Sequence, residues 1–194
     1  MQIVDAVKTK EQIKLMASLL EKHHGSIYSH MWVFGVNAAL RISDLLSITM
    51  EHALTGTVSL REGKTNKLRT IPLNQTALSV AQLRHEQHPE HAYLFQVDCN
   101  RAKHKPISRQ SVSQAFKEVG EILGLKIGTH SMRKTLGWTM YSAGERIERI
   151  SKVLNHKDSG VTMRYIGLTQ ADIDSAYDEY EITFSFNNQN GRVD

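Results

Sequence analysis

Six polar residues along this chain have side chains that could take part in a reaction at an anionic group. They are Arg41, Lys64, His130, Arg133, His156 and Tyr165. Guanidinium and imidazole groups can stabilise an oxyanion, and a tyrosine hydroxyl becomes a nucleophile when a base and a positive field activate it. The set therefore contains the parts for attack by a tyrosine on a phosphate ester.

Each of these residues also has an ordinary explanation when it is considered alone. Arginines and histidines often lie on exposed helix faces, lysines lie in turns, and a tyrosine can pack in the core with its hydroxyl at the rim. That explanation must also account for the order and the spacing. Lys64 follows Arg41 by 23 residues, His156 follows His130 by 26, and Tyr165 follows His156 by nine.

The order Arg, Lys, His-x-x-Arg, His, Tyr resembles the catalytic signature of the tyrosine recombinases, or phage integrases. The resemblance covers Thr9 to Tyr180, nearly the whole chain. It implies an α+β fold, mostly helical, like the catalytic domain of that family with its small antiparallel sheet. No internal repeat or linker interrupts the chain, so we expect one domain over residues 1–182 and a disordered tail over 183–194.

Three positions depart from the family pattern without removing a reacting group. Ala39 stands where the family often has glycine, and Met132 stands where leucine is common. Asn155 replaces the glycine of the family's Leu-Gly-His. Asparagine is the next-best residue after glycine in the left-handed conformation, so we expect a helix end there.

The resemblance implies that Tyr165 attacks a DNA phosphodiester and forms a 3′-phosphotyrosyl bond. This bond conserves the energy of the cleaved bond, so no ATP is required. Arg41, Arg133 and His156 would stabilise the transition state as fixed cationic donors in place of a metal ion. His130 is the candidate general base, because the ordinary pKa of tyrosine is ~10 and its hydroxyl must lose a proton.

The leaving 5′ oxygen needs a proton, and Lys64 is the candidate acid. Lys67 is the alternative, and the place of Lys64 in the family's hairpin favours Lys64. Asp44 follows Arg41 by about one helical turn and could orient its guanidinium. No cofactor and no metal ion are expected.

The composition agrees with a polyanionic partner. The formal charge is +4 and the isoelectric point is about 9.2, although many proteins this basic bind no nucleic acid.

Cys99 is the single cysteine, so no intrachain disulfide can form. No apolar run approaches the ~18 residues that span a bilayer. We therefore expect a cytoplasmic protein, associated with the nucleoid, that binds double-stranded DNA. The residues expected to contact DNA are Lys67, Arg69, Arg101, Lys103, Lys105 and Arg109.

Periodicity and capping residues predict the elements that must position these side chains. Thr9 begins a capping box, and a first helix follows to about residue 22. Ser43 or Asp44 would cap a third helix. The other predicted helices cover residues 28–40, 74–87, 109–123, 130–142 and 146–154, then a short one before Tyr165 and one from Thr169. Residues 57–60 and 68–73 predict a hairpin with a basic tip, and residues 96–107 predict a polar loop.

Two other sequence patterns resemble known binding sites but lack residues that those sites require. Gly63-Lys64-Thr65 resembles the end of a phosphate-binding loop, but the earlier glycine would fall at Val58. The histidines suggest zinc, yet there is no cysteine partner, and Pro89 breaks the helix that would align three of them, so solvated histidines are favoured. The histidines concerned are His23, His24, His85, His88, His91 and His104.

Relatives of this kind work as assemblies, so we expect a homotetramer on DNA, with accessory DNA-bending proteins as further partners. The amphipathic segment with Ile173, Ala176, Tyr177 and Tyr180 could pass to a neighbouring subunit or fold back on its own domain. The chain could be a catalytic fragment, or a short form similar in length to the fimbrial-type invertases. The alternative functions are a type IB topoisomerase and a DNA-binding regulator that has kept the fold without catalysis.

Overall fold

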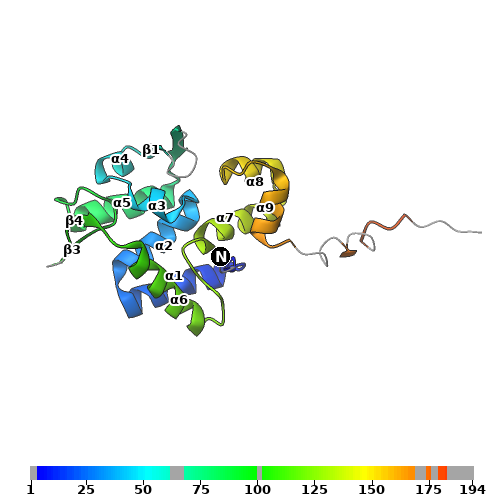
Figure 1. The fold of residues 1–194 in the computed structure, drawn as a ribbon, viewed down its shortest axis with the longest axis horizontal. Coiled ribbons are helices and arrows are strands. Elements are labelled where there is room, and N and C mark those ends of the chain that lie inside the picture. Colours follow the sequence, from blue (N-terminus) through cyan, green and yellow to red (C-terminus); the bar gives the residue numbers. More distant parts are fainter. Residues whose placement is uncertain (1–3, 62–67, 100–101, 169–173, 176–178, 183–194) are drawn as a thin grey trace, which may run out of the picture.

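A computed structural model describes residues 4–61, 68–99, 102–168, 174–175 and 179–182 (Figure 1). Most of the elements are helices. They are α1 (Lys10–His24), α2 (Ser26–Ala38), α3 (Ile42–Leu46), α4 (Met50–Leu54), α5 (Gln75–Gln87), α6 (Arg109–Ile122), α7 (Ser131–Ser142), α8 (Ile147–Val153) and α9 (Ser159–Ile166). The strands are β1 (Thr57–Arg61), β2 (Leu68–Pro72), β3 (Gln96–Cys99) and β4 (Ala102–Pro106). The expected mostly helical α+β class is confirmed.

Helix α2 is the centre of the main core. It packs against α1, α5 and α7, which explains why its sequence is apolar around most of its circumference. Trp32 is fully buried, donates from its indole nitrogen to the carbonyl of Ile13 at 3.0 Å, and meets Phe116 of α6 edge to face. Phe34 meets Phe95 in the same way. This core fixes α7 against the rest of the fold.

A second, smaller core joins α8 and α9 to α7. Ile150, Leu154 and Ile166 are buried there together with Ala39. Gly137 of α7 makes this close packing possible. A Cβ on Gly137 would lie 2.8 Å from the side chain of Ile166 and 3.1 Å from that of Leu154. In Figure 1, α8 and α9 extend beyond α7 on the side away from α5, β3 and β4.

The strands form two separate antiparallel pairs in the described part of the chain. β1 pairs with β2, with Val58 opposite Ile71, so the predicted hairpin is confirmed. The prediction of a loop over residues 96–107 is wrong, because β3 and β4 form a second hairpin there. Its strands carry few apolar residues. Gln96 is buried, and its side chain makes hydrogen bonds there instead of apolar contacts. The sequence of this hairpin therefore lacks the alternation of apolar and polar residues that predicts a strand.

Helix boundaries agree closely with the periodicity. Thr9 caps α1 as predicted, accepting from the backbone nitrogen of Gln12 at 3.2 Å. The expected cap at Ser43 or Asp44 is wrong, because α3 begins at Ile42 and both residues lie inside it. Asp44 is buried and faces Arg41 instead of the helix end.

The C-terminal predictions fall largely outside the described residues. Thr169, Ile173, Ala176 and Tyr177 lie outside the described residues, and so does the predicted tail. Tyr180 is described and is 78% exposed. A single domain over residues 1–182 therefore stays a prediction. None of the helices described is long and apolar enough to cross a membrane.

Candidate active site

Tyr165 lies in the last turn of α9, which ends at Gly167 in the left-handed conformation. Its hydroxyl lies 3.5 Å from Nδ1 of His130 and 3.4 Å from the His130 carbonyl oxygen. Burial raises the pKa of Tyr165, while the charge and hydrogen bonding of Arg133 and the charge of Arg41 lower it. Because burial is the largest of these effects, the phenol stays protonated near neutral pH and needs a base.

His130 immediately precedes α7 and is suited to be that base. Burial is the main cause that lowers its pKa, and the positive charges of Arg133, Arg109 and Arg41 lower it further. A lowered pKa keeps the imidazole neutral at physiological pH, so one ring nitrogen can accept a proton. The Tyr165 proton has two acceptors, the His130 carbonyl and Nδ1. Transfer requires the hydroxyl to turn to Nδ1.

Arg133 is 2% exposed, and its guanidinium forms hydrogen bonds with two chain segments that are distant in sequence. It donates from Nη1 to the carbonyl of Ala39 and from Nη2 to the carbonyl of Leu154, the latter at 2.6 Å. A guanidinium has five N–H donors, so two bonds to carbonyls leave donors for a phosphate oxygen. Burial lowers the pKa of Arg133, and the neighbouring Tyr165 raises it.

Both carbonyls lie at helix ends that contain a left-handed residue, which is Ala39 itself at the end of α2 and the residue after Leu154 at the end of α8. Asn155 has φ 48°, which confirms the left-handed backbone predicted where the family has glycine. Ala39 has φ 49° and ends α2 in the same conformation. The two departures from glycine therefore lie at two left-handed residues, and Arg133 connects the segments that contain them.

Arg41 lies between α2 and α3 and is partly exposed. Its Nη1 lies 3.9 Å from Oδ2 of Asp44, whose side chain is 4% exposed. The charge of Arg41 lowers the pKa of His130, of Arg133 and of Tyr165, so Arg41 is close enough to act on all three. The contact with Asp44 agrees with the predicted orienting role of that carboxylate.

His156 follows α8 and faces Tyr165. The two rings meet edge to face at 4.8 Å, and Nδ1 of His156 lies 3.0 Å from Oγ1 of Thr162. Thr162 also contacts the carbonyl of Asp158 at 3.4 Å, which can take its only proton. In that arrangement His156 donates from Nδ1, and Nε2 donates to a phosphate only when the ring is protonated.

The predicted DNA-binding residues divide into several groups. Arg109 is exposed at the start of α6, and its charge reaches His130. Lys105 is exposed on β4. Arg69 donates to the carbonyl of Val153 at the end of α8, which gives it a structural contact. The remaining residues, including the candidate acids, lie outside what the structure describes, either wholly or in their side chains: Lys64, Lys67, Arg101 and Lys103.

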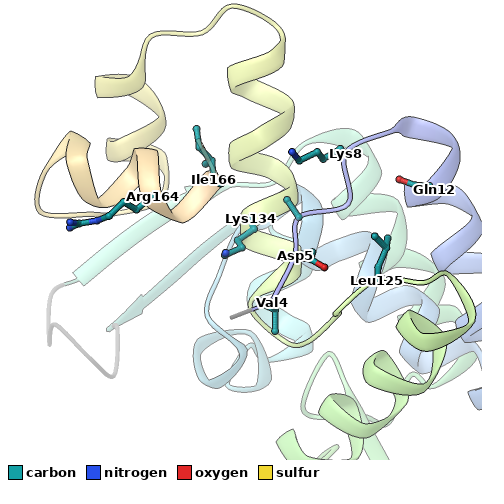
Figure 2. A pocket seen from close by; sticks show the side chains of 10 residues that line it. Val4, Asp5, Lys8, Gln12, Leu125, Lys134, Arg164 and Ile166 are labelled. Atoms are coloured by element: carbon teal, nitrogen blue, oxygen red, sulfur yellow. The ribbon is translucent and has the colours of Figure 1, made fainter. Parts of the chain in front are cut away.

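Sequence reasoning missed Thr162 and Lys134. Thr162 carries no signal except its place three residues before Tyr165. Lys134 follows Arg133 directly, and its Nζ lies 5.4 Å from the centre of the Tyr165 ring. Figure 2 shows Lys134 beside a hollow between the N-terminal segment and α9, which Asp5 and Arg164 also line. Burial lowers the pKa of Lys134, and Asp5 raises it.

Known proteins share both this sequence pattern and this fold. Residues 7–171 match the phage integrase family. The chain is 32% identical over 180 residues to "Probable integrase/recombinase YoeC" of Bacillus subtilis, which covers 91% of this chain and 97% of that protein. It is 27% identical to tyrosine recombinase XerA of Pyrococcus furiosus, over 87% of this chain and 59% of XerA. The chain thus spans nearly all of one relative and little more than half of the other.

Solved structures give the same fold at low identity. A crystal structure of XerA recombinase aligns with a TM-score of 0.70 and 13% identity, covering 95% of this chain and 66% of that one. The Tn1549 transposon integrase in complex with a circular intermediate DNA aligns with a TM-score of 0.69 and 15% identity, over 92% and 67%. With the family match spanning the site from Arg41 to Tyr165, the chain belongs to the phage integrase family of tyrosine recombinases.

Proposed function

We propose that this protein is a site-specific DNA recombinase that cuts and rejoins strands through a covalent bond between Tyr165 and a 3′ phosphate. The observation that carries the proposal is the position of the Tyr165 hydroxyl, 3.5 Å from the imidazole of His130 and beside the guanidinium of Arg133. A phenol held between a neutral base and a buried cation is equipped for nucleophilic attack on an anionic ester.

The reaction divides among the residues of the site. Tyr165 Oη attacks phosphorus while its proton passes to Nδ1 of His130. Arg41 and Arg133 donate to the non-bridging oxygens, where negative charge builds up in the transition state. The bond from phosphorus to the 5′ oxygen breaks, and Lys64 supplies the proton that this oxygen takes up. Attack by the 5′ hydroxyl of another strand reverses these steps and frees Tyr165.

In this site cationic side chains would stabilise the negative charge of the transition state, which a metal ion does in other phosphoryl transfers. Arg133 is held rigidly by two carbonyls, so it is already in place before DNA binds. Such preorganisation lowers the cost of stabilising the transition state. The proposed chemistry therefore requires no divalent metal ion at Tyr165.

Several partners belong to the same proposal. One structural neighbour is described as a lambda integrase tetramer bound to a Holliday junction, and it aligns with a TM-score of 0.62 over 85% of this chain. By analogy we propose that this protein forms a homotetramer on double-stranded DNA, through its C-terminal segment and with DNA-bending accessory proteins. It would act at the nucleoid, in the cytoplasm.

Replacing Tyr165 with phenylalanine tests the proposal. The substrate is a half-site with a nick next to the cut, built from repeats that flank the gene. The wild type should accumulate a 3′-linked adduct on denaturing gels, and Tyr165→Phe should bind the DNA but form none. Tyr141→Phe is the matched control, because Tyr141 is a partly exposed tyrosine on α7. An adduct with Tyr165→Phe would refute the assignment. Relaxation of plasmids without any site would favour a topoisomerase instead.

A further inference from the structure

A cluster of metal-binding side chains lies after the end of α5. The helix stops at Gln87, before Pro89, as the sequence predicted. The chain then turns, and the backbone nitrogen of His91 donates to the carbonyl of His88 at 3.1 Å. This turn places potential ligand atoms of His88, Glu90 and His91 within 4.8 Å of one another. The helix break that argued against a zinc site therefore creates the cluster, without His85.

The separations around His91 match those between ligands of one metal ion. Its Nε2 lies 3.1 Å from Oδ2 of Asp98 and 3.6 Å from Oε1 of Glu90. Metal–ligand bonds of about 2.0–2.1 Å in a tetrahedral site place neighbouring ligand atoms ~3.3–3.4 Å apart. A cation bound at Nε2 would therefore have a carboxylate of Glu90 and one of Asp98 near it, and these two side chains would close around the ion when it binds.

The carboxylate of Asp98 is held in place by the β3–β4 hairpin. Oδ1 accepts from the backbone nitrogen of His104 at 3.0 Å and from Nε2 of Gln96 at 3.3 Å. Gln96 is buried and accepts from the backbone nitrogen of Ala92 at 3.0 Å, next to His91. The same glutamine thus fixes both the turn and the carboxylate. Partners of this kind orient metal ligands in known sites.

His91 is a nearly buried imidazole whose polar contacts within the described residues are all made by Nε2. Its side chain is 5% exposed. Nδ1 is buried and has no hydrogen-bond partner among the described residues. The ring of His88 stacks on that of His91 at 4.4 Å, with an angle of 4° between the planes. Parallel rings cannot both direct a nitrogen at one ion, so the less buried His88 must turn when the ion binds.

We propose that His88, Glu90, His91 and Asp98 bind one divalent transition-metal ion of the zinc type. Two imidazoles with two carboxylates suit zinc or cobalt, whereas magnesium and calcium prefer oxygen ligands alone. The buried Arg84 lines the same hollow, and its charge opposes a cation, but the two carboxylates balance the charge of the ion.

The ion would connect the end of α5 to the hairpin that carries Lys105. Figure 1 shows this part of the fold on the side away from α8 and α9, which contain or adjoin the proposed reaction centre. The expected role is therefore structural. Binding should stabilise the protein and the hairpin without taking part in cleavage at Tyr165.

Titration of the full chain with zinc and with cobalt tests the proposal. A Cys99→Ser background removes the thiol, which could bind either metal. One equivalent of zinc should bind in calorimetry and raise the melting temperature, and cobalt should give the intense visible absorption of a four-coordinate site. Magnesium should do neither.

His88→Asn and Glu90→Gln are the test variants, because both residues are accessible and their loss should leave the fold intact. Each should weaken zinc binding by ~10-fold or more. His52→Asn is the matched control, since His52 is an exposed histidine on α4. Absence of binding at micromolar zinc would overturn the proposal, and so would equal affinity in the test variants and the control.

Discussion

Replacing Arg133 with lysine should lower both stability and activity, because one guanidinium serves both. The positive charge is kept, so the variant isolates the geometry of the donors. Arg133 donates to the carbonyls of Ala39 and Leu154 from two different nitrogens in a site that is 2% exposed. A lysine carries a single ammonium group on a shorter side chain. It cannot donate hydrogen bonds to both carbonyls and also to a phosphate.

The expected loss of stability follows from these contacts. A buried carbonyl left without a partner costs about 1–3 kcal/mol. For a chain of this size, each kcal/mol shifts the melting temperature by about 2–4 °C, so Arg133→Lys should melt ~2–12 °C lower. Loss of one preorganised donor to the transition state should slow cleavage by ~10²–10³-fold.

The assay pairs thermal unfolding with the rate of adduct formation, and Arg41→Lys is the control. Arg41 is predicted to contact the same phosphate, but its side chain is 17% exposed and lies 3.9 Å from Asp44. Both variants should lose activity, and only Arg133→Lys should lose several degrees of melting temperature. If Arg133→Lys melts like the wild type, the two carbonyl contacts do not hold the site together and this reasoning is wrong.

Three further predictions address the base, the acid and DNA binding. Cleavage should fall as the pH drops through the lowered pKa of His130, because the base is then protonated. The folded pKa lies below the ordinary 6.5, so the stability from His130 should also decline as the pH falls below about 6.5, and urea unfolding of His130→Asn should show a flatter dependence. Lys64→Ala should slow cleavage of a normal phosphodiester far more than cleavage of a 5′-bridging phosphorothiolate, whose thiolate leaves without a proton. Equal slowing of both substrates would move the acid, with Lys67 tested next. Lys105→Ala should weaken binding to all DNA sequences similarly and reduce the slope of log affinity against log salt by ~1, in a filter-binding series. A changed sequence preference would instead make Lys105 a reader of bases.

The helices could be predicted because their signals are local. Thr9 and the apolar spacing after it define α1 from neighbouring residues alone. The β3–β4 hairpin could not be predicted in this way. Its strands pair with each other, and the contacts of Gln96 satisfy buried polar groups instead of giving an apolar alternation. Propensity rules detect apolar faces, so a hairpin held by polar contacts escapes them.

The site could be predicted as a list of residues but not as an arrangement. Order and spacing indicated Arg41, His130 and Arg133 without showing what holds them. Thr162 and Ala39 contribute a hydroxyl and a carbonyl, and neither group has a signature in sequence. The cluster around His88 has no signal in the sequence for a different reason: Pro89 predicts where α5 ends, but it does not predict which side chains the following turn brings together.

The contacts of Arg133 also explain how the site can depend on the whole fold. A non-glycine residue in the left-handed conformation costs roughly 1–2 kcal/mol, and Ala39 bears that cost at φ 49°. Its methyl group is buried among Ile150, Leu154 and Ile166, which offsets part of the cost. The carbonyl that this conformation exposes is the one that Arg133 uses. If the end of α2 or the end of α8 moves, Arg133 loses a partner and the cation beside Tyr165 is no longer fixed. Catalytic geometry is therefore coupled to the packing of α8 and α9 on α7, and contacts that shift those helices would control the reactivity of the tyrosine.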